Sequence, residues 1–288
     1  MDLDSLAMAL LIGSAIVLAA VVGVRFAGRL GIPGLLLYLG LGLVLGTAFP
    51  GLNFSDASLA TVLGYAALVV ILAEGGLTTR MSDLRPVLWP SVVLATIGVG
   101  VSITVVAGAL ILVVGLDPQI AILIGAVLAA TDAAAVFSVL RRLRLQPKLR
   151  SLLEAEAGFN DAPVVVLVVV VATGSFDADR PWLVPLIVIG EIIGGAATGL
   201  LVGFIAKWVL PRLALPAVGL YPIAVLSFLV GAYGLADLIH SSGFMATYVA
   251  ALVVGACRGL PHRRSVVGFA EGMAWIAQIG LFVMLGLL

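Results

Sequence analysis

Apolar stretches that are long enough to span a bilayer occupy most of this sequence. Runs of roughly 18 or more residues with few charges are typical of transmembrane helices. Proline and glycine mark most of the boundaries between the runs, as expected where helices begin or end. We predict an all-α polytopic membrane protein with ten helices, at roughly 6–24, 33–49, 58–76, 88–115, 118–140, 149–173, 183–210, 217–239, 243–256 and 266–288.

Local signals refine this pattern. Asp117-Pro118 has the features of a helix N-cap followed by a first-turn proline, and so predicts a helix start. The run 243–256 is short, which favours a tilted or half-length helix. No linker is long enough to separate soluble domains, so we expect one transmembrane domain over 1–288. The last run is still apolar at Leu288, so we expect a chain truncated after about ten helices.

The composition excludes a soluble enzyme. Hydrophobic residues make up 62% of the 288 positions and charged residues 10%, whereas soluble domains are about half apolar and a quarter charged. The mean hydropathy is +1.27. The single cysteine, Cys257, allows no intrachain disulfide. The first 24 residues lack the basic start of a signal peptide, and their apolar run is too long for one.

The basic residues are distributed asymmetrically. With ten spans, fourteen of the fifteen Lys and Arg residues fall in loops on one side, and Arg180 alone falls on the other. Short cytoplasmic loops are enriched in Lys and Arg, so we predict a plasma-membrane protein with its N-terminus outside. The most basic loop joins the fifth and sixth runs and contains Arg141, Arg142, Arg144, Lys148 and Arg150.

Two aspartates lie deep inside adjacent apolar runs. At a rise of ~1.5 Å per residue, Asp132 is about 13 Å from the cytoplasmic edge marked by Arg141. Asp161 is about 16 Å from the same edge, marked by Arg150. Both positions are near the midplane of a hydrocarbon core of about 30 Å, on helices that run in opposite directions. Intramembrane carboxylates are costly, so they indicate a functional site by default.

Oxygen ligands near these carboxylates suit hard monovalent cations such as Na⁺ or K⁺. Burial raises the pKa of a carboxylate toward neutrality, so that it holds either a proton or a cation. This competition supports coupled exchange if the site opens to one side of the membrane at a time. We predict an ion and proton site at Asp132, Asp161, Thr131 and Asn160. Glu156 lies four residues before Asn160 on the same helix face and would support the site.

Structural roles are open for the same residues. Asp132 or Asp161 could serve only as a polar contact between helices. Glu74, about 9 Å deep, could extend its carboxylate toward the cytoplasm. Thr131 could hydrogen-bond its own helix backbone. A salt bridge to the basic loop explains Glu154 better than a role in transport.

Two segments around the aspartates resemble a known family. Residues 129–141 read AATDAAAVFSVLR, and residues 153–161 read LEAEAGFND. At this spacing they resemble the NhaP-type monovalent cation/proton antiporters, and the TDAAAVFS form is most similar to the potassium/proton branch. Residues 71–77 and 271–278 support the resemblance, which covers essentially the whole chain.

The resemblance implies a NhaA/NhaP-like antiporter fold, an inverted-repeat bundle of about thirteen helices. A six-helix core would move against a dimerising scaffold, so a homodimer is expected. Residues of about 88–174 would form the first core repeat, and the final core helices would be missing. The spacing of Gly195, Gly199 and Gly203 independently predicts close helix contact, in a bundle or a dimer.

The resemblance also implies roles for the site residues. Asp132 and Asp161 would bind the monovalent cation and the proton, and Thr131 would supply a ligand oxygen from an unwound stretch. Asn160 would orient the site, and the Asn-Asp pair points to electroneutral exchange. In addition, Glu156 would contact an arginine on a later helix, and Glu74 would lie on the cytoplasmic approach.

Three departures from the family pattern bear on ion preference. Ala157 stands where relatives usually have serine, so one oxygen ligand is missing. Ala162 separates Asp161 from Pro163, where relatives often have proline directly after the aspartate. Ala133 follows Asp132, where many relatives have proline.

The sequence therefore predicts a secondary active antiporter, not an enzyme, that exchanges H⁺ for K⁺ and/or Na⁺ by alternating access. The expected partners are the transported ions and the lipid bilayer; no cofactor and no nucleic acid is expected. One alternative is a sodium-coupled organic-solute symporter on a similar scaffold, which would need a wider polar lining. Another is an intramembrane aspartyl protease, but its Gly-x-Gly-Asp pattern is absent around Asp132 and Asp161.

Overall fold

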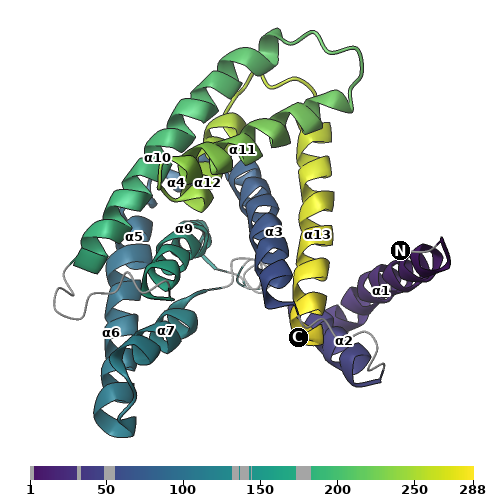
Figure 1. Cartoon of the computed structure of the whole chain (residues 1–288). Coiled ribbons are helices and arrows are strands. Elements are labelled where there is room, and N and C mark those ends of the chain that lie inside the picture. Colours follow the sequence, from purple (N-terminus) through teal and green to yellow (C-terminus); the bar gives the residue numbers. More distant parts are fainter. Residues whose placement is uncertain are drawn as a thin grey trace. The chain divides into compact units, whose positions relative to one another are not determined.

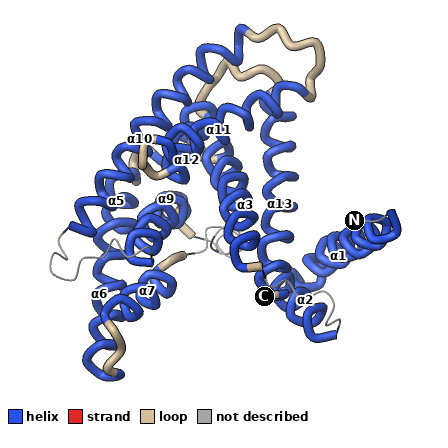
Figure 2. Tube along the Cα trace, in the orientation of Figure 1, coloured by secondary structure: helices blue, strands red, loops and turns tan. Residues whose placement is uncertain are grey.

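The structure, a computed structural model, describes residues 3–30, 34–48, 56–131, 136, 143, 145–172 and 183–288. Every regular element in these ranges is helical (Figures 1 and 2). Seven of the helices are long and apolar enough to cross a membrane, judged by length and composition. Shorter apolar helices lie at Gly34–Ala48, Pro118–Ala129 and Gly243–Gly255. Each predicted apolar run contains one of these helices, so the all-α polytopic prediction is confirmed.

The chain divides into two compact units, which are described separately. Unit 1 comprises Met1–Ile71 and Ala270–Leu288. It contains α1 (Leu3–Leu30), α2 (Gly34–Ala48), most of α3 (Ala57–Thr78) and most of α13 (Arg263–Leu287). Within it α1 packs on α2, and α2 meets α13 at Gly42 and Gly286, where no side chains separate the backbones.

Unit 2, Leu72–Phe269, contains all the described residues of the predicted site. After the end of α3 come α4 (Met81–Leu84) and a rod that runs from Leu88 to Val114. The rod joins α5 (Leu88–Val93), η2 (Leu94–Gly98), α6 (Val99–Ala109) and η3 (Leu110–Val114). Both η segments are π-helical, and the linking residues keep helical dihedral angles.

The next helix, α7 (Pro118–Ala129), begins as predicted. The Asp117 side chain accepts a 2.9 Å hydrogen bond from the Gln119 backbone N–H, and Pro118 is the first helical residue. Helix α9 (Pro147–Ala172) lies beside α7, and both pack on the α5–α6 rod. A buried cluster from α6, α7 and α9 holds these helices together: Val99, Ile103, Ala126 and Val164.

Helix α9 is the most enclosed of the long helices. Its most apolar part is 59% buried, whereas the corresponding figures for the other six range from 11% to 33%. A helix that is apolar on all sides is expected in the interior of a bundle. Asn160, in the middle of α9, is accordingly fully buried among other helices.

The remaining helices of unit 2 pack through small residues. They are α10 (Leu183–Val209), a short turn η4 (Leu210–Arg212), α11 (Leu220–Leu238) and α12 (Gly243–Gly255). A Cβ atom on Gly195 or Gly199 would overlap the backbone carbonyl of Ser242 or Ala246. At Gly203 it would lie 2.8 Å from Val253 Cβ. The predicted close contact is confirmed, and it joins α10 to α12 within one chain.

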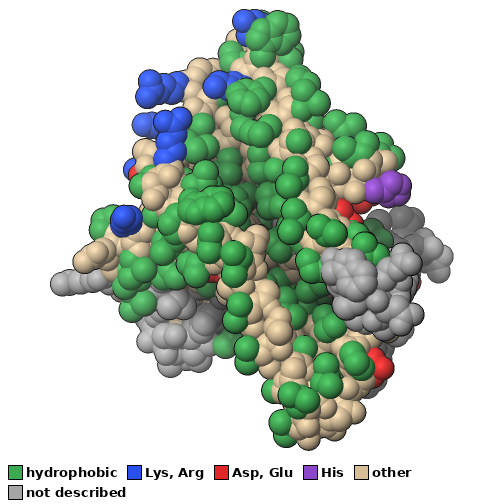
Figure 3. Space-filling view, turned by 90° about the vertical axis from the view of Figure 1, so that its left-hand side faces the viewer, with side chains coloured by type: hydrophobic (Ala, Val, Ile, Leu, Met, Phe, Trp, Pro, Cys, Tyr) green, Lys and Arg blue, Asp and Glu red, His purple; other side chains and the backbone are tan. Residues whose placement is uncertain are grey.

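Lys and Arg side chains gather toward one end of the face drawn in Figure 3, and hydrophobic side chains cover much of the rest. This surface agrees with the uneven distribution of basic residues along the sequence. Large apolar side chains are exposed on most of the long helices, including Val105, Leu186 and Phe204. Such surfaces suit hydrocarbon and not water.

Candidate ion-binding site

Helix α7 ends at Ala129, well before the apolar run does. Ala130 has extended backbone angles (φ −64°, ψ 133°), Thr131 is not helical, and Val136 is helical again. The prediction of a helix through residue 140 is therefore wrong at this point. Residues 132–135 lie outside the described residues, so the predicted role of Asp132 stays a prediction.

The Asn160 amide connects α9 to this non-helical stretch. Its Nδ2 atom donates to Thr131 Oγ1 at 2.9 Å and to the Ala129 carbonyl oxygen at 3.3 Å. It also approaches Glu156 Oε1, one helical turn earlier on α9, at 3.4 Å. A carbonyl group and a carboxylate group can only accept hydrogen bonds. The atom of the Asn160 side chain that faces them must therefore be the amide nitrogen and not the amide oxygen. Thr131 thus bonds another helix, and the alternative of a purely local role is wrong.

Unpaired oxygen atoms collect around this contact. The Asn160 side chain is fully buried, and its Oδ1 atom accepts no hydrogen bond from any described residue. Pro163 lies inside α9 and has no N–H, so it cannot bond the Phe159 carbonyl one turn earlier. Oxygen atoms with free lone pairs and a negative helix end favour a cation here.

The other predicted site residues lie on the same unit. Asp161, next to Asn160, is half-buried and takes part in electrostatic contact with the Tyr248 phenol group. Glu74 is half-buried near the end of α3. The next helical turn after Glu74 carries Thr78, whose hydroxyl group donates back to the Glu74 carbonyl at 3.0 Å.

Glu154 forms the salt bridge that the sequence indicated. Its Oε1 atom lies 2.8 Å from Arg150 Nε, one helical turn earlier on α9. The two side chains are 40% (Arg150) and 32% (Glu154) exposed, so water screens the pair and its contribution to stability is modest.

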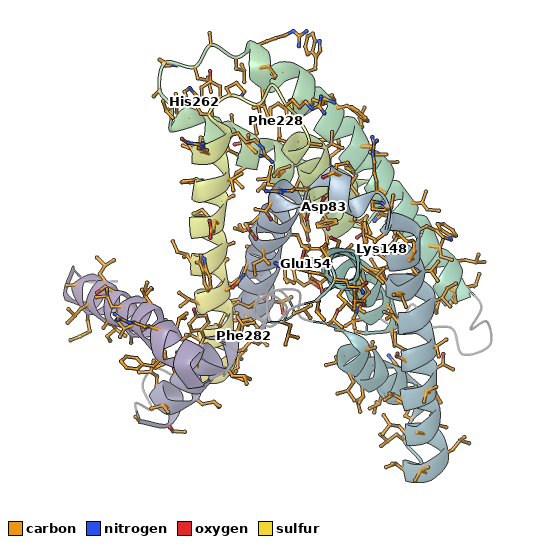
Figure 4. The ribbon with its side chains drawn as sticks, turned by 180° about the vertical axis from the view of Figure 1, so that it is seen from behind. Asp83, Lys148, Glu154, Phe228, His262 and Phe282 are labelled. Carbon is orange, nitrogen blue, oxygen red and sulfur yellow. The ribbon has the colours of Figure 1, made fainter. Side chains whose placement is uncertain are left out.

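A polar vestibule of about 560 Å³ opens beside this salt bridge. The end of α3 and the turn of α4 form one wall, and the start of α9 forms the other; Figure 4 labels Asp83 and Glu154 on these two sides. The sequence analysis did not predict this cavity. The consecutive polar residues Thr78, Thr79 and Arg80 at the end of an apolar run could have indicated a polar lining there. Its polar lining includes Thr78, Thr79, Arg80, Asp83, Arg150 and Glu154.

An interrupted helix beside an intramembrane aspartate is a known transporter arrangement, and comparison with known proteins identifies the family. The transmembrane model of sodium/hydrogen exchangers matches residues 16–288. This chain belongs to the sodium/hydrogen exchanger family. The predicted resemblance is confirmed.

Individual relatives place the exchanger chain among NhaP proteins. It is 36% identical to the K⁺/H⁺ antiporter NhaP2 of Shewanella sp. strain MR-4, over 100% of this chain and 50% of the relative. It is 30% identical to the Na⁺/H⁺ antiporter ApNhaP of Aphanothece halophytica, over 82% of this chain and 47% of the relative. The chain thus spans about half the length of these relatives. Both relatives are named as antiporters.

A solved relative confirms the antiporter fold. The structure of the sodium proton antiporter MjNhaP1 from Methanocaldococcus jannaschii matches with a TM-score of 0.78 and 26% sequence identity. The match covers 98% of the chain described here and 70% of the MjNhaP1 chain.

Proposed function

We propose that this chain belongs to an antiporter that exchanges H⁺ for K⁺ and/or Na⁺ by alternating access. The observation that carries the proposal is the buried Asn160 amide. It bridges α9 to the non-helical stretch after α7 and keeps an oxygen atom available beside Asp161. Such a group suits a ligand that is a bare cation and needs several oxygen atoms in a dry site.

The proposed site combines one charge with several neutral oxygen atoms. Asp161 supplies the carboxylate that holds either the proton or the cation. Thr131 and Asn160 supply neutral oxygen atoms, and Glu156 holds the Asn160 amide in position. Asp132 would add its carboxylate from the segment after Thr131, with Glu74 on the cytoplasmic approach.

Several wider features belong to the same proposal. The N-terminus would lie outside the plasma membrane, and the vestibule would face the cytoplasm, because Arg80 and Arg150 line it. Residues of about 88–174 would form the first core repeat of an inverted-repeat bundle, and the protein would form homodimers. K⁺ and Na⁺ are both proposed as substrates, since the relatives include proteins named for each ion.

Proton flux in vesicles tests the proposal. The full-length protein would be reconstituted with an imposed pH gradient, and K⁺ or Na⁺ would be added separately. The wild type is expected to dissipate the gradient on addition of at least one ion, and Asp161→Ala is expected not to. Absence of cation-driven proton flux in the wild type would refute antiport. Exchange by Asp161→Ala at the wild-type rate would refute the site.

A further inference from the structure

Tyr248 of α12 lies between the polar vestibule and Asp161. Its side chain is only 4% exposed, and its ring packs edge-on against Phe159 of α9, with 5.4 Å between ring centroids. The hydroxyl group rests on α9 at Gly158, where a Cβ atom would come within 2.9 Å of Tyr248 Oη. Any larger residue at position 158 would displace this hydroxyl group.

The position of Gly158 locates the hydroxyl group along the ion path. Glu154, Gly158 and Asp161 are spaced by four and three residues, so they share one face of α9. Glu154 lines the vestibule, and Asp161 lies about 10 Å further along the helix axis. Gly158 lies between the two carboxylates on this face, so the Tyr248 hydroxyl group that rests on Gly158 lies between them along the helix axis.

Thr79 holds the hydroxyl group from the side of the vestibule. Thr79 lines that cavity and shares a hydrogen bond with Tyr248. The Thr79 hydroxyl group also donates to the Gly75 carbonyl at 2.6 Å, which fixes its position just after the end of α3.

From this arrangement we propose that Tyr248 is the inner gate of the vestibule, and that its hydroxyl group, positioned by Thr79, helps to hold the cation at Asp161. The inference rests on the proposed antiport function. The buried Tyr248–Phe159 ring pair closes the space between vestibule and site to bulk water. The phenol oxygen gives a cation that has lost its water a neutral ligand next to the Asp161 carboxylate.

The test is the concentration dependence of cation-driven proton flux by the full-length protein in vesicles, with K⁺ and Na⁺ measured separately. Tyr248→Phe keeps the ring contact with Phe159 and removes only the hydroxyl group. We expect the apparent KM for the cation to rise about fivefold to tenfold, as for loss of one hydrogen-bonding partner. The maximal rate should change less than twofold, since a binding contact is lost without loss of the gate.

Thr79 variants separate positioning from simple packing. Thr79→Val should raise the KM as Tyr248→Phe does, and the double variant should be no worse than either single variant. Thr79→Ser keeps the hydroxyl group and should restore the wild-type KM. The control is Tyr233→Phe, which removes a hydroxyl group from another tyrosine–phenylalanine pair, Tyr233–Phe244, in which the ring centroids are 5.2 Å apart.

The outcomes are distinguishable. A wild-type KM in Tyr248→Phe would overturn the assignment of the Tyr248 hydroxyl group to the cation site while leaving antiport intact. An equal rise in Tyr233→Phe would also overturn it, because the effect would then come from general packing. If neither K⁺ nor Na⁺ drove proton flux by the wild type, the proposed antiport function would be refuted, and the proposed role of Tyr248 would be refuted with it.

Discussion

The Asn160 amide donates a 2.9 Å hydrogen bond to the Thr131 hydroxyl group and so joins two transmembrane segments at the point where one of them stops being helical. Thr131 follows the end of α7, and Asn160 is fully buried in the middle of α9. The contact stabilises the non-helical segment, and it leaves Asn160 Oδ1 without a hydrogen bond from any described residue.

Replacing Asn160 by alanine should damage stability and exchange together. The variant loses the donor to Thr131 and to the Ala129 carbonyl, and interhelical hydrogen bonds in membranes contribute about 0.6–2 kcal/mol each. We expect thermal unfolding in detergent at a lower temperature and at least roughly tenfold slower exchange, the factor that 1.4 kcal/mol represents. Normal exchange by Asn160→Ala would contradict its placement in the site.

Thr131 offers a milder test of the same contact. Thr131→Val keeps the shape of the side chain but removes the acceptor for Asn160. We expect a several-fold rise in the apparent KM for the cation, because one hydrogen bond and one ligand oxygen are lost. Thr131→Ser keeps the hydroxyl group and serves as the control. If the serine variant were as impaired as the valine variant, the methyl group and not the oxygen atom would be the important part.

The sequence predicted the number and places of the helices well, because an apolar run of sufficient length has few alternatives in a membrane. The apolar pattern did not predict the end of α7 at Ala129, although the family resemblance implied an unwound stretch at Thr131. Alanine is the best helix former, and no glycine or proline lies between Ala129 and Val136. The stretch departs from the helix where a tertiary contact, from Asn160, satisfies a backbone carbonyl that a helix would otherwise bond.

The candidate site was only partly visible in the sequence. Asp161 and Glu156 could be recognised in the sequence because they are charged residues within apolar runs. Burying a charge in a membrane costs free energy, so such residues indicate a functional site. Tyr248 gave no such signal, because tyrosine is common in apolar helices and its partner Thr79 is far away in the sequence. Only the fold brings α3, α9 and α12 together, with Gly76 of α3 and Gly158 of α9 both against Tyr248.

Gln119 should stabilise the pairing of α7 with α9. Its Nε2 atom donates a 2.7 Å hydrogen bond to the Val171 carbonyl oxygen, which lies in the last described turn of α9. Gln119→Leu should lower the free energy of unfolding by about 1 kcal/mol. The measurement is denaturant unfolding in detergent. Asp117→Asn, which keeps the N-cap acceptor, is the matched control and should be close to wild type.

Two glycines of α10 should respond differently to substitution by alanine, because one is in close contact with α12 and the other is not. Gly199→Ala should destabilise the bundle by about 1–3 kcal/mol, because the added methyl group meets the backbone of Ala246. Gly190→Ala is the control, since nothing lies within 4 Å of its added Cβ atom. Thermal unfolding should separate the two variants clearly. Equal effects would mean that α10 and α12 are not in close contact in the membrane.

The proposed competition at Asp161 makes the cation affinity depend on pH. A protonated carboxylate cannot hold the cation, so below the pKa of the site each unit of acidification should raise the apparent KM by about tenfold. Above that pKa the KM should level off, and the maximal cation-bound population should be the same at every pH. Proton-coupled flux in vesicles, measured over a range of cation concentrations at several pH values, tests this relation. A KM that stayed constant while the maximal rate fell would show that the proton and the cation bind at separate sites.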